Sequence, residues 1–196
     1  AFTAFFVRYM FEQFGKIKCL CVEDTEKMSN LLESDYELIR RLQTFSANLF
    51  IHSMRVSVMS MRVSQKMGYN SLLAKAGGMY HEIGRIKKEE NYVEATNDIA
   101  YAYDFPKCLT DLILQVCDKD EKPESREAMV VMLSDSIVSM IEYFEKNTDK
   151  SRPSKEKLIE SVFANRQKKG NFDNCDISEK EIEGIKETYK NINMDF

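Results

Sequence analysis

The sequence predicts an all-α domain, a bundle of about eight helices, and three observations favour this fold class. Charged residues, rich in Lys and Glu, make up 31% of the 196 residues, which is typical of long helices with exposed faces. Only 7 glycines and 3 prolines interrupt the chain, too few for a protein of strands and tight turns. Apolar residues also recur at spacings of three and four, the period of a helix with one buried face.

The N-terminal segment, residues 1–24, differs in composition from the rest, and we expect it to precede a helical domain at 25–196. Its first 14 residues contain six aromatic side chains. Two interpretations remain open: an amphipathic helix docked on the domain, or the cytoplasmic end of a linker that descends from a membrane segment. Within this segment, residues 17–23 are expected to form a short extended stretch.

The expected helices follow in order along the chain. The first covers about 25–43. The second, about 46–67, places Leu49, Val56 and Val63 on one face and ends at Gly68, a residue type that commonly terminates helices. Serines at predicted N-cap positions begin several of the others. The remaining helices are expected at about 70–83, 92–102, 106–117 and 125–146, then from 154 to before Gly170, and from Ser178 onward.

Composition excludes several classes of function. The formal charge is −4, with acidic and basic residues interleaved, so the basic stripe of a nucleic-acid-binding protein is not evident. A small phosphate-bearing ligand remains compatible, because a few local cations suffice to bind it. No apolar run approaches the roughly 18–20 residues of a membrane span. The 5 cysteines lack paired metal spacing and are expected to be reduced thiols of a cytoplasmic protein.

The residues that could carry chemistry are few. The chain has only 2 histidines, and the apolar pattern places both His52 and His81 on buried helix faces. Glu82 follows His81 directly, and Asp135 lies in line with apolar residues of its helix, where a carboxylate is costly unless it is paired. Two explanations remain open. The four side chains either form a hydrogen-bonded polar network or bind a divalent cation such as Mn, Fe, Zn or Mg.

Three segments resemble a known family. MYHEIGRIK (79–87) is similar to the HDIGKIK core of the HD superfamily of metal-dependent phosphohydrolases, LFIHSMRVS (49–57) precedes it at a suitable distance, and EAMVVMLSDSIVSM (127–140) resembles the family's Asp-bearing helix. The likeness extends over 35–53, 69–87 and 170–187 to the cytoplasmic domain of seven-transmembrane HD receptors. Members of that group hydrolyse cyclic di-AMP. The resemblance implies an HD-type helical bundle in the cytoplasm, with attachment to a membrane segment preceding this chain.

Metal ligands follow from the same resemblance. His52, His81 and Asp135 match ligand positions of the family, and Glu82 occupies the place of its signature Asp. A Glu side chain carries its oxygens one methylene further from the backbone, so the helix or the ion must shift to compensate.

Substrate contacts and a second metal are the less complete part of the resemblance. Arg85 and Lys87 follow the motif and could meet substrate phosphates, or they could form a solvated basic turn. The family has a His pair, one of them a ligand to a second metal, where this chain has Val116 and Cys117. Another family His belongs to a segment that is missing between residues 92 and 106. The resemblance therefore implies one metal ion at most.

Three classes of function remain open on this evidence. The first is a degenerate, mononuclear metal-dependent phosphohydrolase, similar to a cyclic dinucleotide phosphodiesterase. The second is a non-catalytic module that binds or senses a nucleotide. The third is a structural domain, which is disfavoured because a core free of function could replace its buried charges by apolar residues. For the first two the expected partner is a small phosphate-containing ligand such as a cyclic dinucleotide.

Overall fold

The computed structural model describes residues 22–118 and 122–193. These residues form nine α-helices and one 3₁₀ helix and contain no strand, which confirms the all-α prediction. The elements are α2 (Val22–Leu31), α3 (Glu37–Phe45), α4 (Ala47–Met67), α5 (Ser71–Tyr80), η1 (Ile83–Lys87), α6 (Tyr92–Ala102), α7 (Lys107–Cys117), α8 (Arg126–Lys146), α9 (Lys155–Lys168) and α10 (Glu179–Asn191).

Helix ends follow the local signals of the sequence. Gly68 ends α4 in the left-handed conformation, with φ of 73°, a backbone geometry that glycine adopts without a steric penalty. At the other end of α4 the Ser46 side chain accepts a hydrogen bond from the Leu49 N–H. Ser125 and Ser178 cap α8 and α10 in the same way. The predicted bounds of these helices are therefore confirmed within a residue or two.

The prediction of one helix over 25–43 is wrong. The structure has two helices there, α2 and α3, separated by residues 32–36. The buried Tyr80 hydroxyl donates to the Leu31 carbonyl at the end of α2, so a residue of α5 satisfies one of the groups that a longer helix would have used. Residues 22 and 23, expected to be extended, are helical. The rest of the extended stretch, and residues 1–21 as a whole, lie outside the described residues.

Helix α5 also ends earlier than predicted, at Tyr80 instead of residue 83. The ring of the next residue, His81, hydrogen-bonds through Nδ1 to the Gly78 carbonyl, at 2.8 Å. That carbonyl would otherwise serve the next turn of the helix. The chain then continues as η1, so the end of α5 and the position of His81 are determined together.

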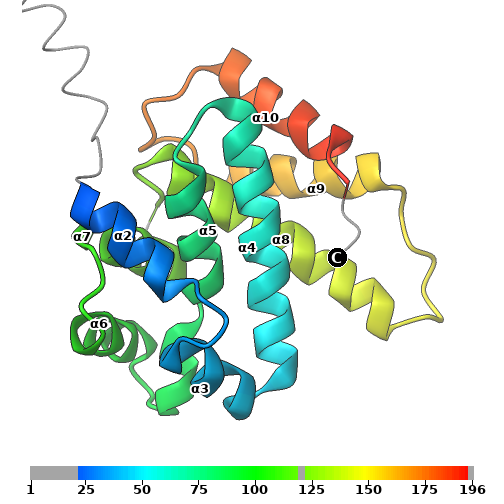
Figure 1. The fold of residues 1–196 in the computed structure, drawn as a ribbon. Helices are drawn as coiled ribbons and strands as arrows, with labels where there is room; N and C mark the ends of the chain where they lie inside the picture. The colour runs from blue at the N-terminus through cyan, green and yellow to red at the C-terminus, as the bar shows by residue number, and fades with distance from the viewer. Residues whose placement is uncertain (1–21, 119–121, 194–196) are drawn as a thin grey trace, which may run out of the picture.

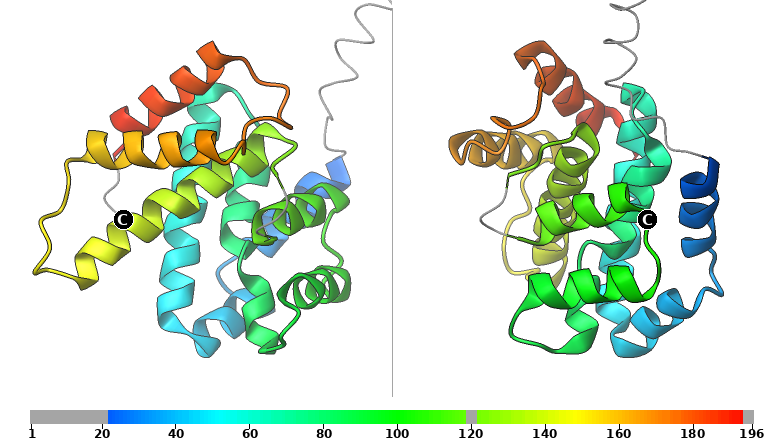
Figure 2. Two further views of the ribbon diagram at one scale, coloured as in Figure 1. Left: turned by 180° about the vertical axis from the view of Figure 1, so that it is seen from behind. Right: turned by 90° about the vertical axis from the view of Figure 1, so that its left-hand side faces the viewer.

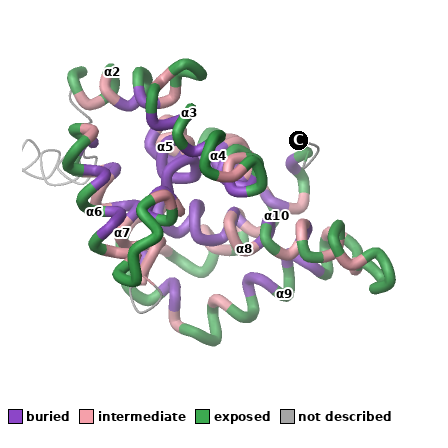
Figure 3. The backbone as a smooth tube through the Cα atoms, turned by 90° about the horizontal axis from the view of Figure 1, so that it is seen from below, coloured by how far each residue is buried: buried purple, intermediate pink, exposed green. Residues whose placement is uncertain are grey.

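Helices α4, α5 and α8 form the centre of the molecule (Figure 1). Helix α4 packs against both of the others, and the buried residues gather where the three meet (Figure 3). The approach of α4 to α5 requires Gly78, because a Cβ atom there would lie 2.6 Å from the Cα of Ser57. The two backbones are therefore in direct contact one turn away from His81.

The other helices cover the centre from two sides. Helices α2, α6 and α7 lie on one side, and α9 and α10 lie on the other (Figures 1 and 2). Within the second group, Phe163 of α9 packs against Phe172 and against Tyr189 of α10. The buried Tyr189 hydroxyl joins this group to the core, because it donates to the Val130 carbonyl of α8. Within the described parts of the chain, no helix is long and apolar enough to cross a membrane.

Candidate metal centre

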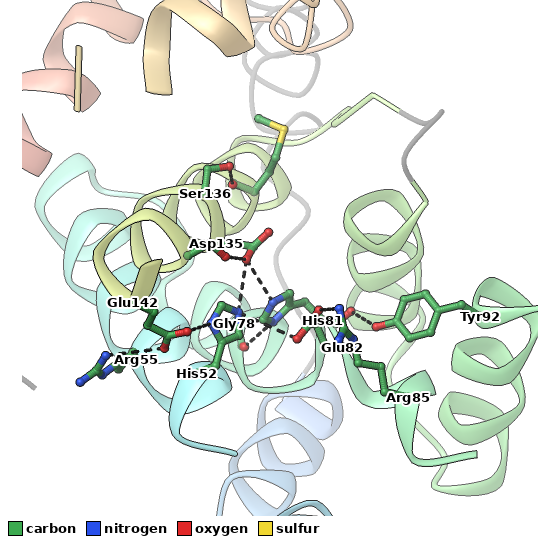
Figure 4. Close-up of polar contacts among 12 residues, drawn as sticks. His52, Arg55, Gly78, His81, Glu82, Arg85, Tyr92, Asp135, Ser136 and Glu142 are labelled. Atoms are coloured by element: carbon green, nitrogen blue, oxygen red, sulfur yellow. Dashed lines mark hydrogen bonds and ion pairs between the residues drawn. The ribbon is translucent and has the colours of Figure 1, made fainter. Parts of the chain in front are cut away.

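Three helices bring His52, His81 and Asp135 together, as the sequence predicts for a metal site. His52 comes from α4, His81 follows α5, and Asp135 comes from α8 (Figure 4). The Asp135 Oδ1 atom lies 3.2 Å from His52 Nε2 and 3.8 Å from His81 Nε2. One ligand atom from each side chain lies within 4.8 Å of the other two. We call these three residues the triad.

In each imidazole ring the contact of Nδ1 orients the ring so that Nε2 faces the other residues of the triad. His81 Nδ1 faces the Gly78 carbonyl, and His52 Nδ1 lies 3.1 Å from Glu142 Oε2. A carbonyl and a carboxylate can only accept hydrogen bonds, so both Nδ1 atoms carry the proton. In the neutral rings, both Nε2 atoms then present lone pairs to the centre of the triad. His81 Nε2 is buried and has no hydrogen-bond partner among the described residues, so the donor set fits a metal ion.

Glu142 supports the triad from the same helix as Asp135. The two residues are seven apart, so they lie two turns apart on one face of α8, and His52 lies between their carboxylates. Arg55 contacts Glu142 at 3.6 Å and Glu145 at 2.8 Å on the outer side. The sequence interpretation missed Glu142, although its spacing from Asp135 was a signal that could have found it.

The charges of the triad stabilise one another. Burial by itself lowers the pKa of His52, but the hydrogen bond and charge of Asp135, together with the charges of Glu142 and Glu82, outweigh it and raise that pKa above its usual value. Burial likewise raises the pKa of Asp135, but His52 and His81 outweigh it and hold that pKa well below its usual range. Without a metal, His52 and Asp135 therefore each favour the charged form of the other, and a divalent cation would replace the proton that Nε2 carries in the charged form of His52.

The surroundings of Asp135 and Glu82 differ from those that the sequence predicts. The Asp135 side chain keeps 30% of its surface exposed, because it faces a cavity instead of lying among the apolar residues of α8. Glu82 Oε2 lies 4.0 Å from His52 Nε2, while Glu82 Oε1 pairs with Arg85. Glu82 is thus next to the triad, with one oxygen directed to it and the other held by a cation (Figure 4).

The two cations predicted to meet a substrate phosphate occupy different surroundings. A cavity of about 1150 Å³ opens beside the triad, and Arg85 is among the residues that line it. Lys87 is not among them. Its Nζ lies 2.7 Å from Asp98 and 3.4 Å from Glu89, on the outer side of η1.

Val116 and Cys117 line the same cavity, so the positions that the resemblance associates with a second metal do lie beside the triad. Burial raises the pKa of the Cys117 thiol to about 11, so without a metal the thiol is protonated near neutral pH. Both histidines of the chain already belong to the triad. A second ion would therefore have no imidazole to bind it.

Comparison with known proteins agrees with this geometry. The HD domain family matches residues 49–140, a range that contains the whole triad. Cyclic-di-AMP phosphodiesterase PgpH of Bacillus subtilis is 22% identical over 84% of this chain, and ribonuclease Y of Aster yellows witches'-broom phytoplasma is 29% identical over 49% of it. The chain spans 30% of the length of PgpH and 19% of that of ribonuclease Y.

Solved structures show the same fold. The crystal structure of the Listeria monocytogenes PgpH HD domain in complex with cyclic-di-AMP superimposes with a TM-score of 0.68 at 20% identity, over 79% of this chain and 93% of the other. The HD resemblance predicted from the short motifs is therefore confirmed. Residues 49–140 of this chain are an HD domain, homologous to the cyclic-di-AMP phosphodiesterase PgpH and sharing the fold of the PgpH HD domain.

Proposed function

We propose that this domain is a degenerate HD phosphohydrolase that holds one divalent cation at most and acts on a phosphodiester of a cyclic dinucleotide. The observation that carries the proposal is the convergence of His52 Nε2, His81 Nε2 and Asp135 Oδ1 beside a cavity. Three protein ligands leave a coordination position open, as catalytic metal sites require. An ion bound there would polarise a phosphate oxygen and make a water molecule more acidic.

The donor set also suggests which ion would bind. Two imidazole nitrogens and one carboxylate oxygen suit Mn, Fe or Zn better than an all-oxygen ion such as Mg. Glu82 is the candidate fourth ligand, through Oε2, the oxygen that is not paired with Arg85. Arg85 is placed to meet a phosphate in the cavity, whereas Lys87 could do so only by leaving Asp98.

A cyclic dinucleotide is the proposed ligand because of homology and space. The related PgpH domain has been crystallised with cyclic-di-AMP. The cavity of about 1150 Å³ is somewhat larger than the roughly 300–1,000 Å³ of common small-molecule sites, and so is large enough for a dinucleotide. The cytoplasmic location and membrane attachment implied by the sequence resemblance belong to the same proposal.

A second candidate is a non-catalytic module that binds the nucleotide without hydrolysing it. The replacement of the second-metal positions by Val116 and by a protonated Cys117 favours this alternative, since two-metal sites use both ions to stabilise the attacking and leaving oxygens. The triad and the cavity would then serve binding alone.

Metal analysis combined with a hydrolysis assay tests these proposals. The purified protein, supplied with Mn²⁺ or Fe²⁺, should contain about one ion per chain, and Asp135→Ala should lose it while the exposed Asp149→Ala should keep it. Product formation from cyclic di-AMP in Mn²⁺, with a short single-stranded RNA as the comparison substrate, supports the enzyme. Bound metal and calorimetric heat without product support the binding module. If the protein stays free of metal, the metal site is refuted both for the enzyme and for the binding module.

A further inference from the structure

Four cations line the wall of the cavity: Arg85, Lys122, Arg166 and Lys169. Two of them have carboxylate partners, since Arg85 pairs with Glu82 and Lys122 lies 3.1 Å from Asp173. Lys169 is exposed. Arg166 differs from the other three, because it is half-buried and forms no ion pair with a carboxylate among the described residues.

Arg166 extends from α9 to the helix that carries Asp135. Its Nε and Nη2 atoms both donate to the Ser136 hydroxyl, at 3.1 and 2.6 Å. That hydroxyl in turn donates to the Met132 carbonyl, at 2.8 Å, so Ser136 is oriented as an acceptor (Figure 4). The guanidinium is thereby held beside the residue that follows Asp135. Only part of its five N–H groups is used, and the partner is a neutral oxygen.

Burial of a guanidinium without a carboxylate is unfavourable unless an anion completes the site. Asp135 supplies some negative charge nearby, since it acts to raise the pKa of Arg166 against the lowering effect of burial. A divalent cation in the triad would use that charge, and Glu82 is already offset by Arg85. The loaded site would then carry net positive charge next to a cavity, which favours a phosphate.

A second observation concerns Asn171, which lines the same cavity and is only 8% exposed. Its side-chain oxygen is buried and has no hydrogen-bond partner among the described residues. Gly170, with φ of 67°, ends α9 in the left-handed conformation, and the Asn171 backbone N–H then donates to the Arg166 carbonyl at 3.0 Å. The turn that ends α9 thus places a polar amide with unused hydrogen-bonding capacity five residues after Arg166, on the same cavity.

We propose that Arg166 binds a phosphate group of the ligand through its free N–H groups, and that Asn171 hydrogen-bonds the part of the ligand next to that phosphate. This inference rests on the proposed function and adds to it a phosphate subsite on α9. Arg166 lies outside every segment that carries the HD resemblance, whereas Asn171 lies in the segment 170–187. The subsite would take a phosphate monoester or diester, whether free or part of a nucleotide.

Calorimetry on the Mn²⁺-loaded protein tests the subsite with two probes, cyclic di-AMP and inorganic phosphate. Arg166→Met keeps the aliphatic stem and should weaken both by about 10- to 100-fold, because charged hydrogen bonds to phosphate are lost. Arg166→Lys should be intermediate, since a lysine cannot form the forked bonds. Lys168→Met is the matched control: it removes the same charge from the same helix, but Lys168 is exposed and does not line the cavity. Metal content should stay unchanged in all three variants.

The outcomes separate this inference from the proposed function. Equal binding by the wild type and Arg166→Met would overturn the subsite and leave the cyclic dinucleotide proposal intact. Binding of inorganic phosphate that depends on Arg166, without binding of cyclic di-AMP, would support the subsite and refute the dinucleotide. Binding of neither probe by the wild type would overturn both. If thermal denaturation shows that Arg166→Met does not fold, the comparison of Arg166→Lys and Asn171→Ala with the wild type decides.

Discussion

Replacing Glu142 by leucine tests whether the triad is organised as a metal site. The Glu142 side chain is 16% exposed, and its Oε2 lies 3.1 Å from His52 Nδ1. This contact keeps the proton on Nδ1 and the lone pair of Nε2 directed to the triad. Among residues 22–118 and 122–193, Glu142 is the acceptor of that proton, so Glu142→Leu leaves the ring free to rotate or to change tautomer. We therefore expect the variant to bind metal more weakly.

The magnitude follows from the type of contact. Loss of the hydrogen-bond acceptor behind a metal-ligating histidine typically lowers metal affinity about 10- to 100-fold, or about 1.4–2.8 kcal/mol. One effect opposes this loss: Glu142 raises the pKa of His52, so its removal also lessens competition by protons. That relief is small at a pH above the folded pKa of His52, and the full loss should appear there. Glu142→Gln, which keeps an accepting oxygen, should lose less.

Calorimetric titration with Mn²⁺ measures the effect directly. Glu145→Leu is the matched control, because Glu145 also pairs with Arg55 but is 43% exposed and is not among the carboxylates that pair with His52. We expect wild-type affinity for this control. Wild-type Mn²⁺ affinity in Glu142→Leu, in a variant that remains folded, would refute the argument that Glu142 orients His52. An equal loss in both variants would point to general charge instead of ring orientation.

Three further expectations concern packing, protonation and the second metal. Gly78→Ala should lower the free energy of unfolding by about 1–3 kcal/mol in chemical denaturation, because its Cβ would press on α4. Gly184→Ala is the control and should be neutral, because its Cβ has no contact closer than 3.6 Å. Equal free energies of unfolding in the two variants would contradict this. In the metal-free protein the raised pKa of His52 stabilises the fold below about pH 6.5, and this contribution is lost as the pH rises through the folded pKa of His52. The lowered pKa of Asp135 stabilises the fold above about pH 3.8, and this contribution is lost as the pH falls through the folded pKa of Asp135. Metal binding needs neutral His52, so the rise in Tm caused by Mn²⁺ should grow as the pH rises through the folded pKa of His52. A rise independent of pH would argue against His52 as a ligand. Cys117→Ser should keep wild-type metal content, and a loss measured by elemental analysis would show that the thiol is a ligand after all.

The helices themselves could be predicted because their signals are local. The 3.6-residue period of the apolar positions, the serine caps and Gly68 depend on neighbours within one or two turns, and they placed α4, α6 and α8 correctly. One error arose where a distant group intervenes, because the Tyr80 hydroxyl donates to the Leu31 carbonyl at the end of α2. The other arose from a local side chain, because the His81 ring bonds to the Gly78 carbonyl three residues earlier, a contact that the period of the apolar residues does not predict.

The candidate site divides in the same way. Two histidines in a chain of 196 residues, together with Asp135 on an apolar helix face, predicted either a polar network or a metal site, and the HD resemblance identified the three residues as ligands. Whether their nitrogen and oxygen atoms converge depends on the contact of α4 with α5 at Gly78 and on the packing of α8 against both. The sequence alone also could not separate Arg85 from Lys87, which are two residues apart but face the cavity and the outer surface respectively.

The sequence by itself determined the helical fold class, the HD motif and the identity of the potential ligands, because these depend on residue type and short-range spacing. Only the tertiary structure decided that Asp135 is partly open to a cavity, that Glu142 lies behind His52, and that Arg166 and Asn171 reach the same space from α9 and the turn after it. These residues are far apart in the chain, and side-chain packing between helices, which no short segment encodes, sets the distances between them.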